Sequence, residues 1–284
     1  QIVDALVAND KPVSYCNVAS PCGHDAFLLP HEVDTYGGLL AAMLVRTNGH
    51  DESDREPESD GEAVPGHSDT SIFRGRRVDY DQFERLLEEE IDPAATSVLD
   101  LGCGDGRLLQ RLQRGRWCRL QGVEVHQRQV LAAVRRGVDC IHADLNDGLD
   151  RFREKQFDCV LLSRTLQAVY NVDRVVDDML RVGRTCIISF PNFAFEPLRR
   201  MLAEQGRAPC APGLLRYNWY DTPNIRFLSI ADFQDFCRRK GATVQRLVAL
   251  NTDLGHEVNE EPNRNADLAI FVISRSGEGK APPA

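Results

Sequence analysis

Residues 98–106 have the sequence Val-Leu-Asp-Leu-Gly-Cys-Gly-Asp-Gly. This stretch predicts a short apolar strand with one acid near its end, followed by a glycine-rich turn that opens a helix. Glycines at 102, 104 and 106 let the backbone turn sharply and approach a ligand closely, and the amides at the start of the next helix can hold an anionic group. The pattern therefore favours a nucleotide-like cofactor.

The spacing of these glycines argues against a dinucleotide. The dinucleotide fingerprint places its third glycine three residues after its second, and Arg107 stands at that position. Asp100 would place a carboxylate beside the turn, which suits an ammonium group such as that of S-adenosylmethionine better than a pyrophosphate. Glu124, twenty residues past Gly104, ends the apolar stretch 120–125 and is a candidate to bind the ribose diol. Taken alone, the turn and Glu124 are also compatible with a plain tight turn and a solvated strand end, but together they favour a cofactor site.

Outward from this turn, apolar runs and helical patterns alternate along the chain. Strands are expected at 97–101, 119–125, 138–142, 156–163 and 185–190, with helices near 105–114, 127–136 and 172–182. Two more strands are expected near 242–250 and 267–274. The alternation predicts an α/β fold with a Rossmann-like, doubly wound parallel sheet.

The carboxyl ends of these strands should form one pocket, because ligands of such sheets bind outside those ends. Candidate cofactor-binding residues fall at strand ends or in the loops that follow: Asp100, Gly102, Cys103, Gly104, Gly106, Glu124, Asp144, Leu145 and Ser163. Asp144 would reach the adenine amino group. An ordinary aspartate that caps a turn remains an equal alternative for that residue.

The region from about 95 to 275 resembles the class I S-adenosylmethionine-dependent methyltransferases, and specifically the MetW family of methionine biosynthesis proteins. The resemblance is carried by the glycine-rich stretch and by four further segments, at 166–169, 179–183, 189–193 (Ser-Phe-Pro-Asn-Phe) and 219–225 (Trp-Tyr-Asp-Thr-Pro-Asn-Ile). It implies a methyltransferase-like fold in a protein connected with homoserine acylation in methionine synthesis. Arg164 departs from the pattern, in which glutamine is expected at that position.

The first 45 residues are similar to the carboxyl end of homoserine O-acetyltransferase, an α/β-hydrolase. Residues 2–8 suggest the end of a helix, 13–18 a strand and 32–45 another helix, and the Gly-His-Asp-Ala-Phe-Leu run at 23–28 carries the resemblance. It implies that His24 is the general base of a serine acyltransferase and that Asp25 lines the homoserine site. The sequence contains no Gly-x-Ser-x-Gly elbow for the nucleophile. We therefore expect the chain to be the carboxyl-terminal part of a longer fusion.

Residues 46–72 separate this hydrolase-like segment (1–45) from the methyltransferase-like domain (73–275). They contain eight acids and two arginines, a formal charge of −6 out of −9 for the chain, with few large apolar residues. This composition predicts a disordered linker, and 276–284 a disordered tail. A helix from about Tyr80 to Ile91 should cover the sheet or the pocket edge with its apolar face.

Composition indicates a soluble, cytoplasmic protein. The longest apolar stretch, 39–45, is too short to span a bilayer. Nine scattered cysteines without a Cys-x-x-Cys pair fit small core residues in a reducing compartment. The seven histidines lack metal-ligand spacing, and the loop after the fourth strand lacks the Asn/Asp-Pro-Pro-aromatic motif of nucleic-acid base methyltransferases. We expect a small-molecule substrate and no nucleic acid, membrane or metal.

Acceptor-side candidates are Tyr220, Asp221 and Asn224, although Trp219 and Tyr220 are also compatible with a packed lid. Two functions remain open. The domain either transfers a methyl group to a small molecule, or senses S-adenosylmethionine and supports a homoserine O-acyltransferase partner, in cis or as a subunit. The cofactor-side residues are needed for both functions.

Overall fold

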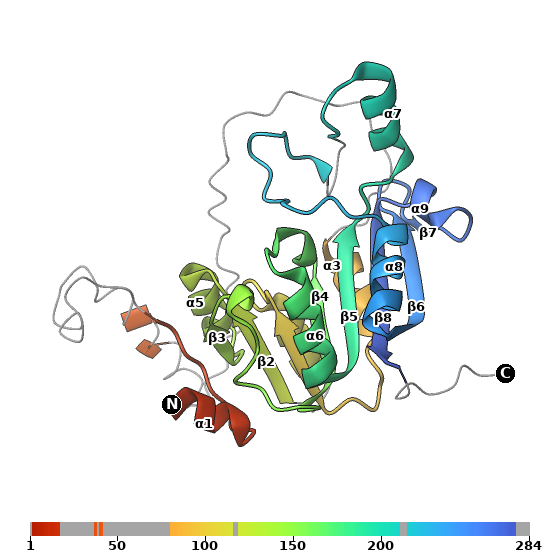
Figure 1. Ribbon diagram of the computed structural model, residues 1–284. Coiled ribbons are helices and arrows are strands. Elements are labelled where there is room, and N and C mark those ends of the chain that lie inside the picture. Colours follow the sequence, from red (N-terminus) through yellow and green to blue (C-terminus); the bar gives the residue numbers. More distant parts are fainter. Residues whose placement is uncertain are drawn as a thin grey trace.

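The computed structural model describes residues 2–17, 37–38, 40–41, 80–115, 119–210 and 215–276. Its centre is an eight-stranded sheet with helices on both faces (Figure 1). The strands are β1 (Ser97–Leu101), β2 (Arg119–Glu124), β3 (Cys140–His142), β4 (Phe157–Ser163), β5 (Gly183–Pro191), β6 (Ala242–Asn251), β7 (His256–Glu257) and β8 (Leu268–Arg275). Their order in the sheet is β3-β2-β1-β4-β5-β8-β6-β7.

Strands β1 to β5 are parallel, so their carboxyl ends meet at one edge of the sheet. β8 lies between β5 and β6 and is antiparallel to both. The expected doubly wound parallel arrangement is confirmed for β1 to β5, and β8 makes the sheet as a whole mixed. A strand can be inserted antiparallel by a short return from its neighbour, whereas a further parallel strand would require a crossover connection.

Alternating side chains of the strands bury two apolar layers, one on each face of the sheet. One face is covered by α3 (Tyr80–Glu89), α4 (Arg107–Gly115) and α5 (Gln127–Arg135), and the other by α6 (Val172–Val182) and α8 (Ile230–Lys240). Short 3-10 helices, η2 (Leu145–Asp147) and η3 (Leu166–Ala168), follow β3 and β4. Figure 1 shows α7 (Glu196–Gln205) beyond the carboxyl edge of β5, and α9 (Pro262–Asn265) precedes β8.

The strands and helices expected from apolar patterning are confirmed, with shifts of one or two residues at most ends. The helix expected from 105 begins at Arg107, because Gly102, Gly104 and Gly106 adopt positive φ and keep the chain in a turn. Helices α7, α8 and α9 and strand β7 were not anticipated.

The amino-terminal segment packs against the β3 edge of this sheet. Helix α1 (Ile2–Ala8) is confirmed, and its Val7 is buried in the same apolar layer as α6. The strand expected at 13–18 is reduced to one parallel bridge between Tyr15 and Ile141, because this segment diverges from β3 after a single pair of hydrogen bonds. The tyrosine amide donates to Cys140 O (2.9 Å), and its carbonyl accepts from His142 N (2.7 Å). The expected linker at 46–72 lies outside the described residues, as do nearly all of the helix at 32–45 and all but Ser276 of the tail.

Candidate functional site

The glycine-rich loop at 102–106 connects the carboxyl end of β1 to α4. Position 102 requires glycine for two reasons: its φ is +74°, and a Cβ there would lie 2.7 Å from Thr165 Oγ1. Gly106 (φ +78°) is similarly close-packed, 3.0 Å from Ala133 Cβ. Gly104 (φ +56°) differs, since no heavy atom lies within 4 Å of the Cβ position. The loop therefore presents open backbone at Gly104, where a ligand could approach closely.

Asp100, on β1 two residues before Gly102, has a buried carboxylate. It is 3% exposed, and its Oδ1 has no hydrogen-bond partner among the described residues. Burial, followed by the nearby charges of Glu124 and Glu84, raises the pKa of Asp100 to about 7. A buried acceptor without a donor costs stability. A cationic ligand group would supply both the missing donor and the missing charge.

Glu124 ends β2 and faces the loop from the neighbouring strand. It is 6% exposed. Its Oε2 accepts from the amide of Gly104 at 3.0 Å, and its Oε1 accepts from the amides of Val125 (2.9 Å) and His126 (2.8 Å). His126 Nδ1 lies a further 2.9 Å from Oε1. Because a carboxylate oxygen has two lone pairs, Oε2 retains one acceptor position for a hydroxyl donor.

The loop after β3 carries Asp144 and Leu145. Asp144 is exposed and caps η2, with its Oδ1 accepting from the backbone and side-chain amides of Asn146 at 2.8 Å each. Its Oδ2 receives no donor from the described residues, so this turn-capping role leaves one oxygen for a ligand. Leu145 is buried. Asn146 Oδ1 in turn accepts from the amides of Tyr170 (3.0 Å) and Asn171 (3.2 Å), which ties this loop to the one after β4.

Cys103 lies within the glycine-rich loop but offers only its backbone. Its thiol is buried, and its Sγ lies 3.6 Å from that of Cys140. The hydrogen bond between the two thiols and their burial raise the pKa of Cys103 well above its ordinary range. A neutral, enclosed thiol is a packing residue and a poor nucleophile.

The loop after β4 borders Gly102 on the other side. Ser163 Oγ accepts from Ser189 Oγ at 3.3 Å. Arg164 adopts a positive φ of 49°, is held by its amide donating to Ser189 O (2.9 Å) and Oγ (3.0 Å), and places its guanidinium 4.8 Å from the centre of the Phe83 ring. Arginine at this position thus contacts α3 and closes one side of the site.

Gln167 in the same loop is a functional candidate that the sequence did not single out. It is 8% exposed, and its Oε1 is buried without a hydrogen-bond donor among the described residues. The segment 166–169 was noted only as part of a family resemblance. Nothing in a glutamine's sequence context signals that its amide oxygen will be left unpaired.

The acceptor-side candidates at 219–225 separate into two groups. Trp219 and Tyr220 are 77% and 70% exposed and pack edge-to-face on each other. Asp221 is also exposed and accepts from Asn218 N at 2.8 Å. Asn224 is buried beside the β4 loop, where the amide of the next residue, Ile225, donates to Gln167 O at 2.9 Å. His24 and Asp25 lie outside the described residues.

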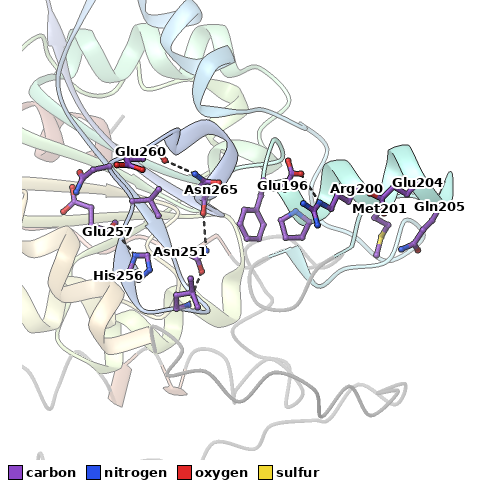
Figure 2. Close-up of a pocket in the computed structure, with 15 residues that line it drawn as sticks. Glu196, Arg200, Met201, Glu204, Gln205, Asn251, His256, Glu257, Glu260 and Asn265 are labelled. Atoms are coloured by element: carbon purple, nitrogen blue, oxygen red, sulfur yellow. Dashed lines mark hydrogen bonds and ion pairs between the residues drawn. The ribbon is translucent and has the colours of Figure 1, made fainter.

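A cavity of about 820 Å³ lies at the carboxyl ends of β5 and β6, some strands away from the glycine-rich loop. Figure 2 shows Glu196 and Arg200 of α7 on one side of it and Asn251, His256 and Glu257 on the other. A smaller cavity of about 370 Å³ lies between η3 and α8. None of the residues predicted from the sequence lines either cavity.

Two kinds of feature are absent from the described residues. None of their helices combines the length and apolar character that a membrane crossing requires. Within the same ranges, no group of three or more histidine, cysteine, aspartate or glutamate side chains is arranged to hold a metal ion.

A family model described as methionine biosynthesis protein MetW matches residues 77–273. The bifunctional methionine biosynthesis protein MetXA/MetW of Rhodopirellula baltica is 42% identical over 97% of the chain, which spans 42% of that relative's length. A homoserine O-succinyltransferase of Psychrobacter arcticus is 48% identical over 50 residues, 17% of this chain and 11% of that protein.

Two solved structures share the fold at low sequence identity. The [4+2]-cyclase SpnF has a TM-score of 0.50 and 18% identity, covering 69% of this chain and 81% of its own. A complex of the Haloferax volcanii Trm112 methyltransferase activator with a methyltransferase has a TM-score of 0.50 and 14% identity, covering 69% and 91%. At these identities the likeness concerns the fold alone.

Proposed function

Because this chain belongs to the MetW family of methionine biosynthesis proteins and has a methyltransferase-like fold, we propose that its sheet domain binds S-adenosylmethionine and transfers the methyl group to a small molecule. The observation that carries this proposal is the unpartnered carboxylate of Asp100, buried below an open glycine-rich loop. A buried acceptor that lacks a donor is expected where a cationic ligand supplies one.

The proposed roles follow from the contacts of each residue. Asp100 would accept from the cofactor's ammonium, and Glu124 would use its free Oε2 position for a ribose hydroxyl. The backbone at Gly102, Cys103, Gly104 and Gly106 would hold the methionine portion, while Asp144 Oδ2, Leu145 and Ser163 would border the remainder. When bound, the cofactor supplies a sulfonium methyl as the electrophile. The protein's own task is to orient the reactants and exclude water.

A second candidate is a non-catalytic sensor of S-adenosylmethionine. It is favoured by the chemistry of the loop itself, where the Cys103 thiol has a pKa raised well above its ordinary range and stays neutral. His126 is held against Glu124 at the surface. A transferase that must remove a proton would need a base from another part of the site.

We further propose that residues 1–45 form the end of a homoserine O-acyltransferase domain, with His24 as its base and Asp25 at the homoserine site, and that 46–72 link it to a domain at 73–275, followed by a tail at 276–284. The similarity of a 50-residue stretch of this chain to a homoserine O-succinyltransferase and the fused name of the Rhodopirellula relative support this. Under either candidate function, the acyltransferase is the expected partner. Tyr220, Asp221 and Asn224 are proposed for the acceptor side.

The test is calorimetric titration of the full chain with S-adenosylmethionine and S-adenosylhomocysteine. Asp100→Ala and Glu124→Ala should each weaken binding by roughly 1.5–3 kcal/mol, since each removes a charged hydrogen-bond partner. Asp178→Asn, which changes a buried carboxylate on α6, is the control and should leave affinity unchanged. Unchanged affinity in both site variants would contradict the pocket assignment.

A second measurement separates the two candidate functions. Transfer of a labelled methyl group to homoserine or its acyl esters would identify an enzyme. Tight cofactor binding without any transfer, combined with an effect on a homoserine O-acyltransferase, would identify a sensor.

A further inference from the structure

The Gln167 side chain is held in one orientation by its own loop. Its Nε2 donates to the carbonyl oxygen of Arg164 at 2.6 Å. The reverse orientation would place two acceptor oxygens at that distance, which is repulsive. The amide oxygen must therefore face the other way, where it is buried and receives no donor from any described residue.

The surrounding contacts leave Gln167 little freedom to turn away. Its carbonyl oxygen accepts from the amides of both Ile225 and Arg226 at 2.9 Å. These bonds join the β4 loop to the segment that buries Asn224. A side chain fixed at both its backbone and its amide nitrogen, with one unpaired oxygen, is preorganised to accept a hydrogen bond from a ligand.

The loop that carries Gln167 also contacts the glycine-rich loop. Thr165, two residues earlier, lies so close to Gly102 that a Cβ there would be 2.7 Å from its hydroxyl. Asp100, on the strand adjacent to β4, carries the other buried acceptor described above. Asp100 near the end of β1 and Gln167 in the loop after the neighbouring strand β4 thus each carry a buried oxygen without a donor among the described residues.

The charge of this region indicates the kind of donor. Three carboxylates, Glu84, Asp100 and Glu124, are buried around the end of β1, and the charges of the other two act on Asp100. Arg111 pairs with one of them, Glu84, at 3.1 Å. A net negative, low-dielectric environment favours a cationic donor over a neutral or anionic one.

We propose that Gln167 is a ligand-binding residue whose amide oxygen accepts a hydrogen bond from a ligand ammonium group. The inference rests on the proposed function, because it assumes a ligand at the glycine-rich loop. The ammonium is either that of the cofactor's methionine portion or that of a second, amine-bearing substrate. Both sources present the same ammonium group, and the two arms of the experiment below distinguish them.

The first arm of the experiment compares S-adenosylhomocysteine, which carries the ammonium, with 5′-methylthioadenosine, which lacks the whole amino-acid portion. Calorimetry is run on the full chain and on Gln167→Met, which keeps the length and removes the acceptor. If the cofactor supplies the ammonium, the variant should bind S-adenosylhomocysteine about 10- to 100-fold more weakly and 5′-methylthioadenosine unchanged.

The second arm uses L-homoserine, with 4-hydroxybutyrate as the analogue that lacks the amine, on protein saturated with S-adenosylhomocysteine. If a second substrate supplies the ammonium, Gln167→Met should bind S-adenosylhomocysteine normally and homoserine about 10- to 100-fold more weakly.

Gln121→Met is the matched control. Gln121 is also buried, but its amide nitrogen lies on β2 and donates to the carbonyls of Val13, Gly122 and Asp139. Gln121→Met should lower the melting temperature and leave the affinities for S-adenosylhomocysteine and homoserine unchanged. Gln167→Met should lower the melting temperature less than Gln121→Met does.

The proposal is overturned if the full chain binds S-adenosylhomocysteine and Gln167→Met changes the affinity for neither probe. If the full chain does not bind S-adenosylhomocysteine and also fails to bind homoserine, the proposed function and this inference fall together. The two failures are therefore distinguishable.

Discussion

At the scale of single residues, the site combines groups that are unfavourable in the isolated protein. Asp100 is buried near two other carboxylates, and Gln167 lacks a donor for its amide oxygen. Arg164 adopts a left-handed backbone conformation at the end of β4. Such costs are retained at functional sites when a ligand relieves them. Relief by a cation makes the site sensitive to the protonation of Asp100.

The first prediction concerns the pH dependence of cofactor binding. The pKa of Asp100 is raised to about 7, whereas a bound ammonium favours the charged carboxylate. Below about pH 7 binding must therefore expel a proton, and the affinity for S-adenosylhomocysteine should fall by up to about tenfold per pH unit and level off above pH 7.

The same raised pKa acts in the opposite direction on the ligand-free protein. Between an unfolded pKa near 3.8 and a folded pKa of about 7, the folded state binds a proton that the unfolded state lacks. Its free energy of unfolding should thus decrease as pH rises through this window. Asp100→Asn should flatten both dependences. Calorimetry and urea unfolding at several pH values measure them, and an undiminished pH dependence in the variant would contradict the assignment.

At the scale of elements, the side chain of Asn192 connects β5, α8 and α9. Asn192 follows β5 and is fully buried. Its Nδ2 donates to Asn263 O (3.0 Å) in α9 and to Ala266 O (2.7 Å), and its Oδ1 accepts from Ala194 N (3.2 Å) and from Ile230 N (3.3 Å) at the start of α8. This network fixes the ends of β5, α8 and α9 relative to one another.

The second prediction is that Asn192→Ala lowers the free energy of unfolding by roughly 2–4 kcal/mol, because it leaves several buried backbone groups without partners. Denaturant unfolding of the full chain measures the loss. Asn259→Ala, at an exposed position, should change stability by no more than about 0.5 kcal/mol. Equal losses in the free energy of unfolding for the two substitutions would show that the Asn192 hydrogen bonds do not contribute to stability.

The elements that the sequence predicts and those that it misses differ in how many of their side chains are buried. β4 is a near-continuous apolar run and β5 is mostly apolar from Cys186 onward, so their burial on both faces could be anticipated. α7 buries only Leu198 and lacks a clear apolar stripe, and β7 has two exposed residues. The sequence does carry local signals for both ends of α8, a Ser229–Asp232 capping box and a C-terminal Gly241.

The candidate site divides in a similar way. Asp100, Glu124 and the glycines could be located because their spacing reflects a turn of defined geometry. Gln167 could not, because the burial of its amide oxygen without a donor among the described residues depends on how the chain packs around it and not on its own sequence context. The antiparallel direction of β8 also depends on pairing with distant strands rather than on its own apolar pattern.

At the scale of the whole molecule, the amino-terminal segment and the sheet domain are joined by polar contacts around one aspartate. Asp10 pairs with Arg119 and with Arg153 (2.7 Å) and accepts from Gln156 Nε2 (2.9 Å). Asn17 N donates to Nδ1 of His142, whose Nε2 donates to Val125 O beside Glu124. The segment thus contacts the strand ends that also border the candidate cofactor site.

The third prediction tests this packing. Asp10→Ala should speed hydrogen exchange of the Tyr15 and His142 amides, whose mutual pairing with β3 depends on the segment staying in place. Hydrogen-exchange mass spectrometry of the full chain measures the rates. Asp150→Ala removes an exposed partner of Arg174 and should leave those amides unaffected. Unchanged exchange in Asp10→Ala would show that its ion pairs do not hold the segment.

The place of β8 in the sheet has a consequence for biosynthesis. This strand is the last of the described strands along the chain, yet it occupies a central position between β5 and β6. On the ribosome, β1 to β5 can pair as they emerge, but β5 keeps an open, apolar edge until translation has passed Arg275. An exposed edge of this kind invites pairing with other nascent chains. Truncation before β8, or a pause in translation shortly before it, should therefore send the chain towards aggregation or chaperone capture.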